Sequence, residues 1–147
     1  MALYLEDLHE GQTFVSGSHL LTAEAIKAFA AEYDPQPFHL SEAAAAASFF
    51  DGLAASGWHT AAVTMRLLTE SLPFAGGVIG GGGEIRWPMA TRPGDSLTVT
   101  TTVEAVAPSR SRPERGAVTL RSETRNQRGE TVQILVSRIL AFRRPAS

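Results

Sequence analysis

Residues 57–72, with the sequence GWHTAAVTMRLLTESL, have the pattern of one long helix. Apolar side chains recur at close to the 3.6-residue period of an α-helix, at Trp58, Ala61, Ala62, Met65, Leu68 and Leu72. Pro73 follows at the point where such a helix should end. Sixteen residues at ~1.5 Å each give a rod of about 24 Å, which is long enough to cross a small domain. We therefore expect residues 57–72 to form a central helix.

The C-terminal half of the chain has the patterns of β-strands. Residues 96–105 alternate between apolar and polar side chains, which predicts a half-buried strand. Residues 118–121 alternate in the same way, and the turn sequence Asn126-Gln127-Arg128-Gly129 separates them from a further strand-like stretch over residues 132–136. This succession predicts an antiparallel hairpin.

Further elements are expected on either side of the central helix. A strand is predicted over residues 12–20, and Thr22 can cap a helix that carries apolar side chains at i, i+3, i+4 and i+7. Ser41 can cap an alanine-rich helix that runs to Phe50. A short strand over residues 84–88 completes the set. Together these patterns predict an α+β fold, in which an antiparallel sheet of about five strands wraps around one long helix.

Composition limits the function classes. A chain of 147 residues with 44% hydrophobic content is expected to form one globular domain over residues 1–147. Thirteen basic and 15 acidic residues leave no positive excess for nucleic acid, and the absence of cysteine excludes disulfides and thiol chemistry. No apolar run approaches the roughly 20 residues that span a bilayer, and residues 1–10 are acidic, unlike a signal peptide. We expect a soluble, cytoplasmic protein.

One pair of acid/base side chains stands out, in the sequence YDPQPFH at residues 33–39. Asp34 and His39 lie five residues apart, in a segment that Pro35 and Pro37 are expected to keep from being helical. An extended backbone spans at most ~3.5 Å per residue, so a bend would bring the carboxylate and the imidazole together. These two side chains can then converge on one small molecule.

The sequence from residue 11 to residue 142 resembles the MaoC-like (R)-specific enoyl-CoA hydratases. The resemblance is carried by residues 29–39, by Gly57 at the start of the apolar helix, and by the turn sequence Arg92-Pro93-Gly94-Asp95-Ser96-Leu97. The family motif is roughly G-D-x-N-P-L/F-H, and the chain keeps its spacing at Asp34, Pro37, Phe38 and His39. Tyr33 stands where the motif has glycine and Gln36 where it has asparagine. The resemblance implies a hot-dog fold, a homodimer, and reversible addition of water to a trans-2-enoyl thioester.

This chemistry assigns roles to residues of the motif. Hydration needs a base that activates water, an acid that protonates Cα, and stabilisation of negative charge on the thioester oxygen. We assign Asp34 as the main base and His39 as its partner, and leave open which group moves which proton. The resemblance implies that the Gly57 N–H, at the positive end of the helix, binds the thioester oxygen. Substrate contacts are expected from Gln36, Phe38, Ser56 and Trp58, with no cofactor and no metal.

Several other candidates have plainer interpretations. His59 has no second ligand at i+4, so we expect a surface or pocket-wall histidine rather than a metal ligand. Residues 80–83 are four glycines that lack the lysine of a phosphate loop, and they are expected to allow close packing or a bulge. Arg110, Arg112 and Arg115 could meet the phosphates of coenzyme A, but a solvated loop is favoured over this role.

Two alternative functions remain open at this stage. A hot-dog thioesterase would carry a carboxylate on the central helix, where Glu70 near the far end is the only acid. A non-catalytic acyl-CoA-binding module would keep the pocket without the chemistry. In each case the sheet has an open edge, which pairing of two copies would close. The sequence leaves the acyl chain and its carrier, coenzyme A or acyl carrier protein, undetermined.

Overall fold

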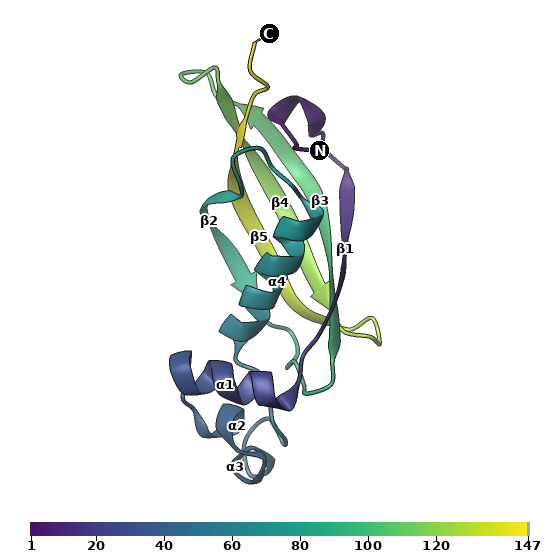
Figure 1. Cartoon of the computed structure of the whole chain (residues 1–147), viewed down its shortest axis with the longest axis vertical. Coiled ribbons are helices and arrows are strands. Elements are labelled where there is room, and N and C mark those ends of the chain that lie inside the picture. The colour runs from purple at the N-terminus through teal and green to yellow at the C-terminus, as the bar shows by residue number, and fades with distance from the viewer. Residues whose placement is uncertain (147) are drawn as a thin grey trace.

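The computed structural model describes residues 1–146, and its main feature is a five-stranded antiparallel sheet that curves around one long helix (Figure 1). The strands run in the order β1-β3-β4-β5-β2 across the sheet. Their bounds are Thr13–Leu20 for β1, Ile79–Arg86 for β2, Ser96–Pro108 for β3, Arg115–Arg125 for β4 and Thr131–Phe142 for β5. This arrangement is the hot-dog fold, and it confirms the predicted α+β class.

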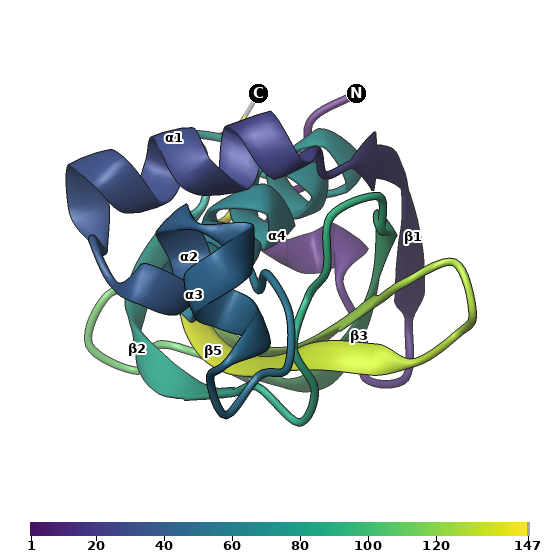
Figure 2. The same ribbon diagram turned by 90° about the horizontal axis from the view of Figure 1, so that it is seen from below.

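The helices fall into two groups. The central helix is α4, Gly57–Ser71, which lies against one face of the sheet (Figure 1). Three shorter helices, α1 (Ala23–Tyr33), α2 (Pro37–Leu40) and α3 (Glu42–Ala46), gather at the end of the molecule where α4 begins (Figure 2). A single 3-10 turn, η1 (Leu5–Asp7), lies at the opposite end. The N-terminus of α4 therefore meets the segments that carry Asp34 and His39.

The alternating pattern of β3 and β4 is confirmed by their burial. Val99, Val103, Val118 and Leu120 are fully buried and form the inner surface of the sheet, while the intervening side chains are partly exposed. The alternation ends at Ala105, where the register with β4 shifts between Val103 and Ala105. These buried side chains of β3 and β4 share core clusters with Val63, Leu67 and Leu68 of α4.

The buried face of α4 differs from the predicted apolar stripe. Trp58 and Met65, which the helical pattern placed in that stripe, are 59% and 43% exposed. Thr60 and Thr64 are buried instead, next to Val63, Leu67 and Leu68. The Thr64 hydroxyl shares a 2.6 Å hydrogen bond with the hydroxyl of Thr124 on β4. This bond satisfies the buried hydroxyl, which from the sequence alone would be expected to face water.

The four glycines at residues 80–83 lie within β2, which begins five residues earlier than the predicted strand at residue 84. The register between β2 and β5 shifts between Gly80 and Gly83. A Cβ atom on Gly83 would lie 2.2 Å from the carbonyl oxygen of Val136, so only glycine permits this approach. Close packing and a bulge were the predicted reasons for this run, and both are confirmed.

Two predictions about the short helices are wrong. Residues 37–40 form one helical turn rather than a non-helical bend, because Pro37 occupies the first turn, where its missing N–H costs no hydrogen bond. The helix capped by Ser41 ends at Ala46 instead of reaching Phe50. The Ser41 cap itself is present, since its hydroxyl accepts a 3.3 Å hydrogen bond from Ala44 N–H. Within residues 1–146, no helix has the length and apolar character needed to cross a membrane.

Candidate active site

Asp34 and His39 lie side by side where α1 ends and α2 begins. Asp34 caps the C-terminus of α1, and its N–H donates to the carbonyl of Ala30 at 2.9 Å. The N–H of Gln36 donates back to the carbonyl of Asp34 at 2.7 Å, which turns the chain into α2. His39 sits on this turn, with its Nε2 atom 3.3 Å from Oδ2 of Asp34. The predicted convergence of the two side chains is present in the structure.

The hydrogen bonds of the His39 ring determine where its proton lies. Nδ1 is 2.6 Å from the carbonyl oxygen of Ala54. A carbonyl oxygen can only accept, so Nδ1 carries a proton and donates it to Ala54. In the neutral imidazole, Nε2 then presents a lone pair on the side that faces Asp34. His39 is only 4% exposed, and the ring therefore has one fixed orientation.

The carboxylate of Asp34 is held by neighbours that favour its charge. Burial alone would raise the pKa of Asp34, but hydrogen bonds from the Ser56 hydroxyl and the Gln36 amide, together with the charge and the hydrogen bond of His39 in its protonated form, outweigh burial and place this pKa below its usual range. The Gln36 side chain donates from Nε2 to Oδ1 at 2.6 Å. Asp34 is thus a carboxylate at neutral pH, with Oδ2 directed toward His39. Gln36, in place of the family's asparagine, still reaches the carboxylate.

A cavity of about 360 Å³ opens in front of this pair. Its walls combine the motif residues with aromatic side chains and with two buried hydroxyls. They are Asp34, Gln36, Phe38, His39, Phe50, Ala55, Gly57, Trp58, Thr60, Trp87, Met89, Ala90 and Thr91. The cavity therefore brings a carboxylate, an imidazole and the start of α4 to the wall of one space.

Of the expected substrate contacts, Gln36, Phe38 and Trp58 line the cavity and Ser56 does not. Ser56 is fully buried, and it caps α4 by accepting a 3.2 Å hydrogen bond from Trp58 N–H. The same hydroxyl lowers the pKa of Asp34, so Ser56 contributes to the site by stabilising the Asp34 carboxylate.

Gly57 begins α4 at the cavity wall, and it faces the indole ring of Trp87. A Cβ atom built on Gly57 would lie 2.7–2.9 Å from three atoms of this ring. The ring is fixed, because its Nε1 donates to Oε1 of Gln133 at 2.9 Å. The contact with Trp87 therefore explains why this position is glycine, whether or not a substrate also approaches its backbone.

We expect Gly57→Ala to lower the free energy of unfolding by about 1–3 kcal/mol, since the added methyl group overpacks the contact with Trp87. The second substitution Trp87→Leu in the same chain should recover most of this loss. Urea denaturation measures both effects. Gly17→Ala is the matched control, since a Cβ atom there meets nothing within 4 Å. Equal losses at positions 17 and 57 would contradict the explanation.

His59 is neither on the surface nor on the cavity wall, which corrects the prediction for this residue. It is 7% exposed and stacks on Phe29 of α1, with ring centroids 4.6 Å apart and planes 6° apart. Its Nδ1 has no hydrogen-bond partner among the described residues. Burial lowers the pKa of His59, and the nearby His19 lowers it further. No group of three potential metal-ligand side chains forms within residues 1–146.

The lowered pKa of His59 predicts a loss of stability in mild acid. The unfolded chain binds a proton on this residue more readily than the folded chain, so stability falls as the pH drops below about 6.5, the ordinary histidine value. We expect the urea midpoint of His59→Phe to change less between pH 7 and pH 5 than that of the native chain. His9→Phe, at an exposed position, is the control. Parallel pH curves for the native chain and His59→Phe would contradict the assignment.

Sequence reasoning missed part of the cavity. Phe50, Trp87 and Thr91 come from outside the motif, and none was expected at the site. Phe50 packs on Phe38 with ring centroids 5.0 Å apart, and Trp87 meets Trp58 edge to face at 5.2 Å. The one available signal was that residues 87–91 run from the end of the strand predicted over residues 84–88 toward the turn at residue 93. That signal places the segment near the sheet edge without saying what it contacts.

Comparison with known proteins assigns the family. The MaoC like domain matches residues 9–126. The chain belongs to the MaoC-like domain family. An uncharacterized protein, YdeM, from Bacillus subtilis is 31% identical over 126 residues, which cover 84% of this chain and 88% of YdeM.

Solved structures of the family share the whole fold. The MaoC-like dehydratase from Rhodospirillum rubrum is 60% identical, with a TM-score of 0.97 over 99% of this chain and all of that one. The R-hydratase PhaJ1 from Pseudomonas aeruginosa is 26% identical, with a TM-score of 0.78 over 97% of this chain and 88% of its own. The chain therefore has the fold of a MaoC-like dehydratase, and the family supports hydratase or dehydratase chemistry in general.

Proposed function

We propose that this MaoC-like protein catalyses the reversible hydration of a trans-2-enoyl-CoA thioester to an (R)-3-hydroxyacyl-CoA. The observation that carries the proposal is the facing pair of His39 Nε2 and Asp34 Oδ2, 3.3 Å apart on the wall of the cavity. Both atoms accept hydrogen bonds when His39 is neutral and Asp34 is ionised. The (R)-configuration of the product is carried over from the R-hydratase of P. aeruginosa.

One water molecule can satisfy both acceptors. Its two hydrogens point to Oδ2 of Asp34 and to Nε2 of His39, which leaves an oxygen lone pair for attack on Cβ of the enoyl group. Attack forms the Cβ–O bond, a proton leaves the water for one of the two side chains, and a proton is delivered to Cα. The net change is the addition of water across the double bond.

Negative charge on the thioester oxygen needs a donor during this attack. The N–H of Gly57 is the first of α4, and helix geometry leaves it without a partner inside the helix. We propose that it binds the thioester oxygen, where such a donor is typically worth ~3 kcal/mol. Phe38 and Trp58 would then pack on the acyl group, and Gln36 would hold Asp34 in place.

Absorbance at the enoyl-thioester band, followed after mixing with crotonyl-CoA, tests the proposal. We expect the band to decay with no release of free thiol, and the decay to require Asp34. Thiol release faster than loss of the band would assign a thioesterase instead. Binding of acyl-CoA without either signal, across a panel of chain lengths and with acyl carrier protein thioesters, would reject catalysis and favour a binding module.

The structure offers the thioesterase alternative little support. Glu70, the acid of α4, is exposed and pairs with Arg66 at 3.0 Å on the far part of the helix. It does not line the cavity. A carboxylate engaged at the surface has no access to an acyl group bound at the start of α4. Hydration therefore remains the function that we propose.

We also propose that two copies of the chain, each one domain, pair as a homodimer. β2 is an edge strand of the sheet, and most of its residues are exposed. Exposed apolar side chains include Ile79 on β2, Trp58 and Met65 on α4, and Met89 after β2. An open strand and apolar side chains of this kind are commonly covered by a second copy. The proposed dimer would work in the cytoplasm, with neither cofactor nor metal.

The dimer predicts a mass near twice 15.7 kDa in solution. Light scattering at several concentrations measures this mass directly. Ile79→Lys, which places a charge on the β2 edge, should shift the mass toward one copy because a like charge would then face its symmetry mate. Val15→Lys is the matched control on β1, the other edge strand. A native mass of one chain at every concentration would reject the dimer.

A further inference from the structure

The segment that leads into α4, residues 50–56, connects directly to both proposed catalytic side chains, and we call it the strap. Its Ala54 carbonyl accepts the Nδ1 proton of His39 at 2.6 Å. Its Ser56 hydroxyl acts on the carboxylate of Asp34 and caps α4. Its Phe50 ring lines the cavity. The path of the strap therefore determines the orientation of the site.

The strap is irregular in conformation, and it begins in a turn that few residues adopt. Asp51 has a φ of +50° and Gly52 a φ of +140°. Backbone of this kind leaves carbonyl groups without the partners that a helix or sheet supplies. The carbonyls of Phe50, Gly52 and Leu53 accept from no backbone N–H among the described residues, so a side chain has to supply the donor.

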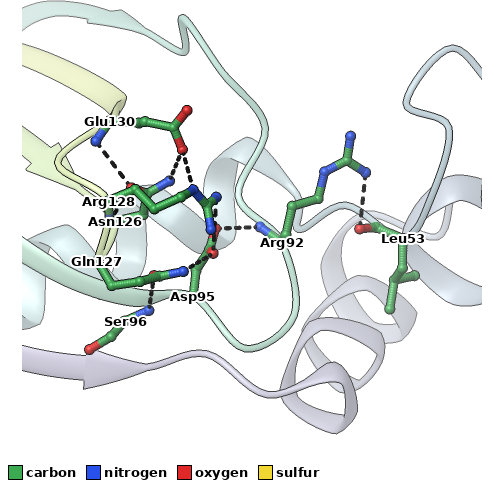
Figure 3. Close-up of polar contacts among 8 residues, drawn as sticks. All are labelled: Leu53, Arg92, Asp95, Ser96, Asn126, Gln127, Arg128 and Glu130. Atoms are coloured by element: carbon green, nitrogen blue, oxygen red, sulfur yellow. Dashed lines mark hydrogen bonds and ion pairs between the residues drawn. The ribbon is translucent and has the colours of Figure 1, made fainter.

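Arg92 is that donor. Its Nη1 donates to the carbonyls of Gly52 at 2.9 Å and Leu53 at 3.3 Å, and its Nη2 donates to the carbonyl of Phe50 (the contact to Leu53 is drawn in Figure 3). Among the described residues, no carboxylate lies within ion-pair distance of this guanidinium. The Arg92 guanidinium therefore binds backbone carbonyls of the strap instead of a carboxylate.

Arg92 is itself held in place by the turn at residues 92–95. Its N–H donates to Oδ2 of Asp95 at 2.9 Å, and Asp95 is only 3% exposed. Gln127, from the turn between β4 and β5, donates to Oδ1 of Asp95 at 3.1 Å (Figure 3). Next to Arg92, the carbonyl of Thr91 accepts from Ala55 N–H at 2.9 Å, a second link to the strap. The sheet and the strap are therefore joined through Arg92 and its neighbours.

We propose that Arg92 is a positioning residue: by binding three carbonyls of the strap, it aims the Ala54 carbonyl at His39, keeps the proton of His39 on Nδ1 and leaves Nε2 facing Asp34. The catalytic consequence rests on the proposed hydration, whereas the effect on the His39 ring does not. The planar fork of a guanidinium serves several carbonyls in a fixed geometry. A lysine ammonium is a point charge without this fork.

Two variants of Arg92 test the proposal through the imidazole ring itself. Long-range ¹H–¹⁵N correlation spectra report which ring nitrogen carries the proton, and the spectrum of His39→Asn identifies the His39 signals. We expect the native chain to show a proton on Nδ1 of His39, and Arg92→Ala to show a mixture of the two tautomers. In Arg92→Ala, kcat should fall about 10²-fold, whereas KM should change much less. Arg92→Lys keeps the charge, and it serves if Arg92→Ala does not fold. It should show the same tautomer change in part.

Arg66→Ala is the matched control, since Arg66 is an exposed residue on the far part of α4. It should leave the His39 tautomer and kcat unchanged, and thermal denaturation checks that each variant is folded. A folded Arg92 variant whose His39 signals match those of the native chain would overturn the proposal, whatever its kcat. A tautomer change in a chain that hydrates no enoyl thioester would support the positioning role and reject the proposed function. The two failures are therefore distinguishable.

Discussion

Asp34→Asn is expected to reduce the rate of crotonyl-CoA hydration at least ~10²-fold, the lower range for loss of a general base. Asparagine fills the same volume and keeps one oxygen for the 2.6 Å hydrogen bond from Gln36. It loses the charge, and an amide group in place of Oδ2 would donate to His39 Nε2 rather than accept from water. The water would then have one acceptor instead of two. Loss of enoyl absorbance, measured at saturating substrate, gives the change in kcat.

Glu10→Gln is the control for this substitution, because it also replaces a carboxylate with an amide. Glu10 is exposed and lies outside the cavity. We expect its rate to equal that of the native chain. Circular dichroism and urea denaturation should show both variants folded. A folded Asp34→Asn chain that hydrates crotonyl-CoA at the native rate would place the base elsewhere.

The sheet could be predicted from the sequence because its signal is local. Residues 96–105 alternate in the printed sequence, and burial of Leu97, Val99, Thr101 and Val103 follows that alternation. A strand with one buried face repeats its pattern every two residues, so no distant partner is needed to detect it. The same holds for the turn at residues 126–129, where Gly129 has the positive φ that the turn requires.

The buried face of α4 could not be predicted in the same way. The helical pattern placed Trp58 and Met65 on the buried face because they are large and apolar, but both are exposed in the structure. Thr64 is buried because Thr124, 60 residues later, offers it a hydrogen bond. A pairing of this kind depends on the register of α4 against β4. A single sequence does not contain that register.

The site was predictable where it depends on nearby residues. Asp34 and His39 lie five positions apart, and the prolines between them leave few paths for the chain. Ala54 and Trp87 contribute through a carbonyl oxygen and a ring that reach the site from other segments. Neither has a sequence signature, because any residue has a carbonyl and a tryptophan suits many cores. Arg92 was noticed as part of a turn, and only the structure links it to the strap.

His39→Asn is expected to reduce hydration at least ~10²-fold as well, for a reason that separates the two ring nitrogens. The asparagine amide can take the place of Nδ1 and donate to the carbonyl of Ala54, so the buried hydrogen bond of 2.6 Å keeps a donor. Nothing then stands where Nε2 faces Asp34. The strap should keep its path, and His9→Asn, at an exposed position, is the control. A folded His39→Asn chain with native kcat would exclude His39 from the reaction.

The double variant Asp34→Asn/His39→Asn shows whether the two side chains act on one water molecule. If they do, removal of either acceptor already removes the activated water, and the second substitution should cost little more than the first. We therefore expect kcat of the double variant to lie within about 10-fold of the slower single variant. If the losses multiply instead, to ~10⁴-fold or more, the two groups act in separate steps. Asp34 would then serve the water at Cβ and His39 the proton at Cα.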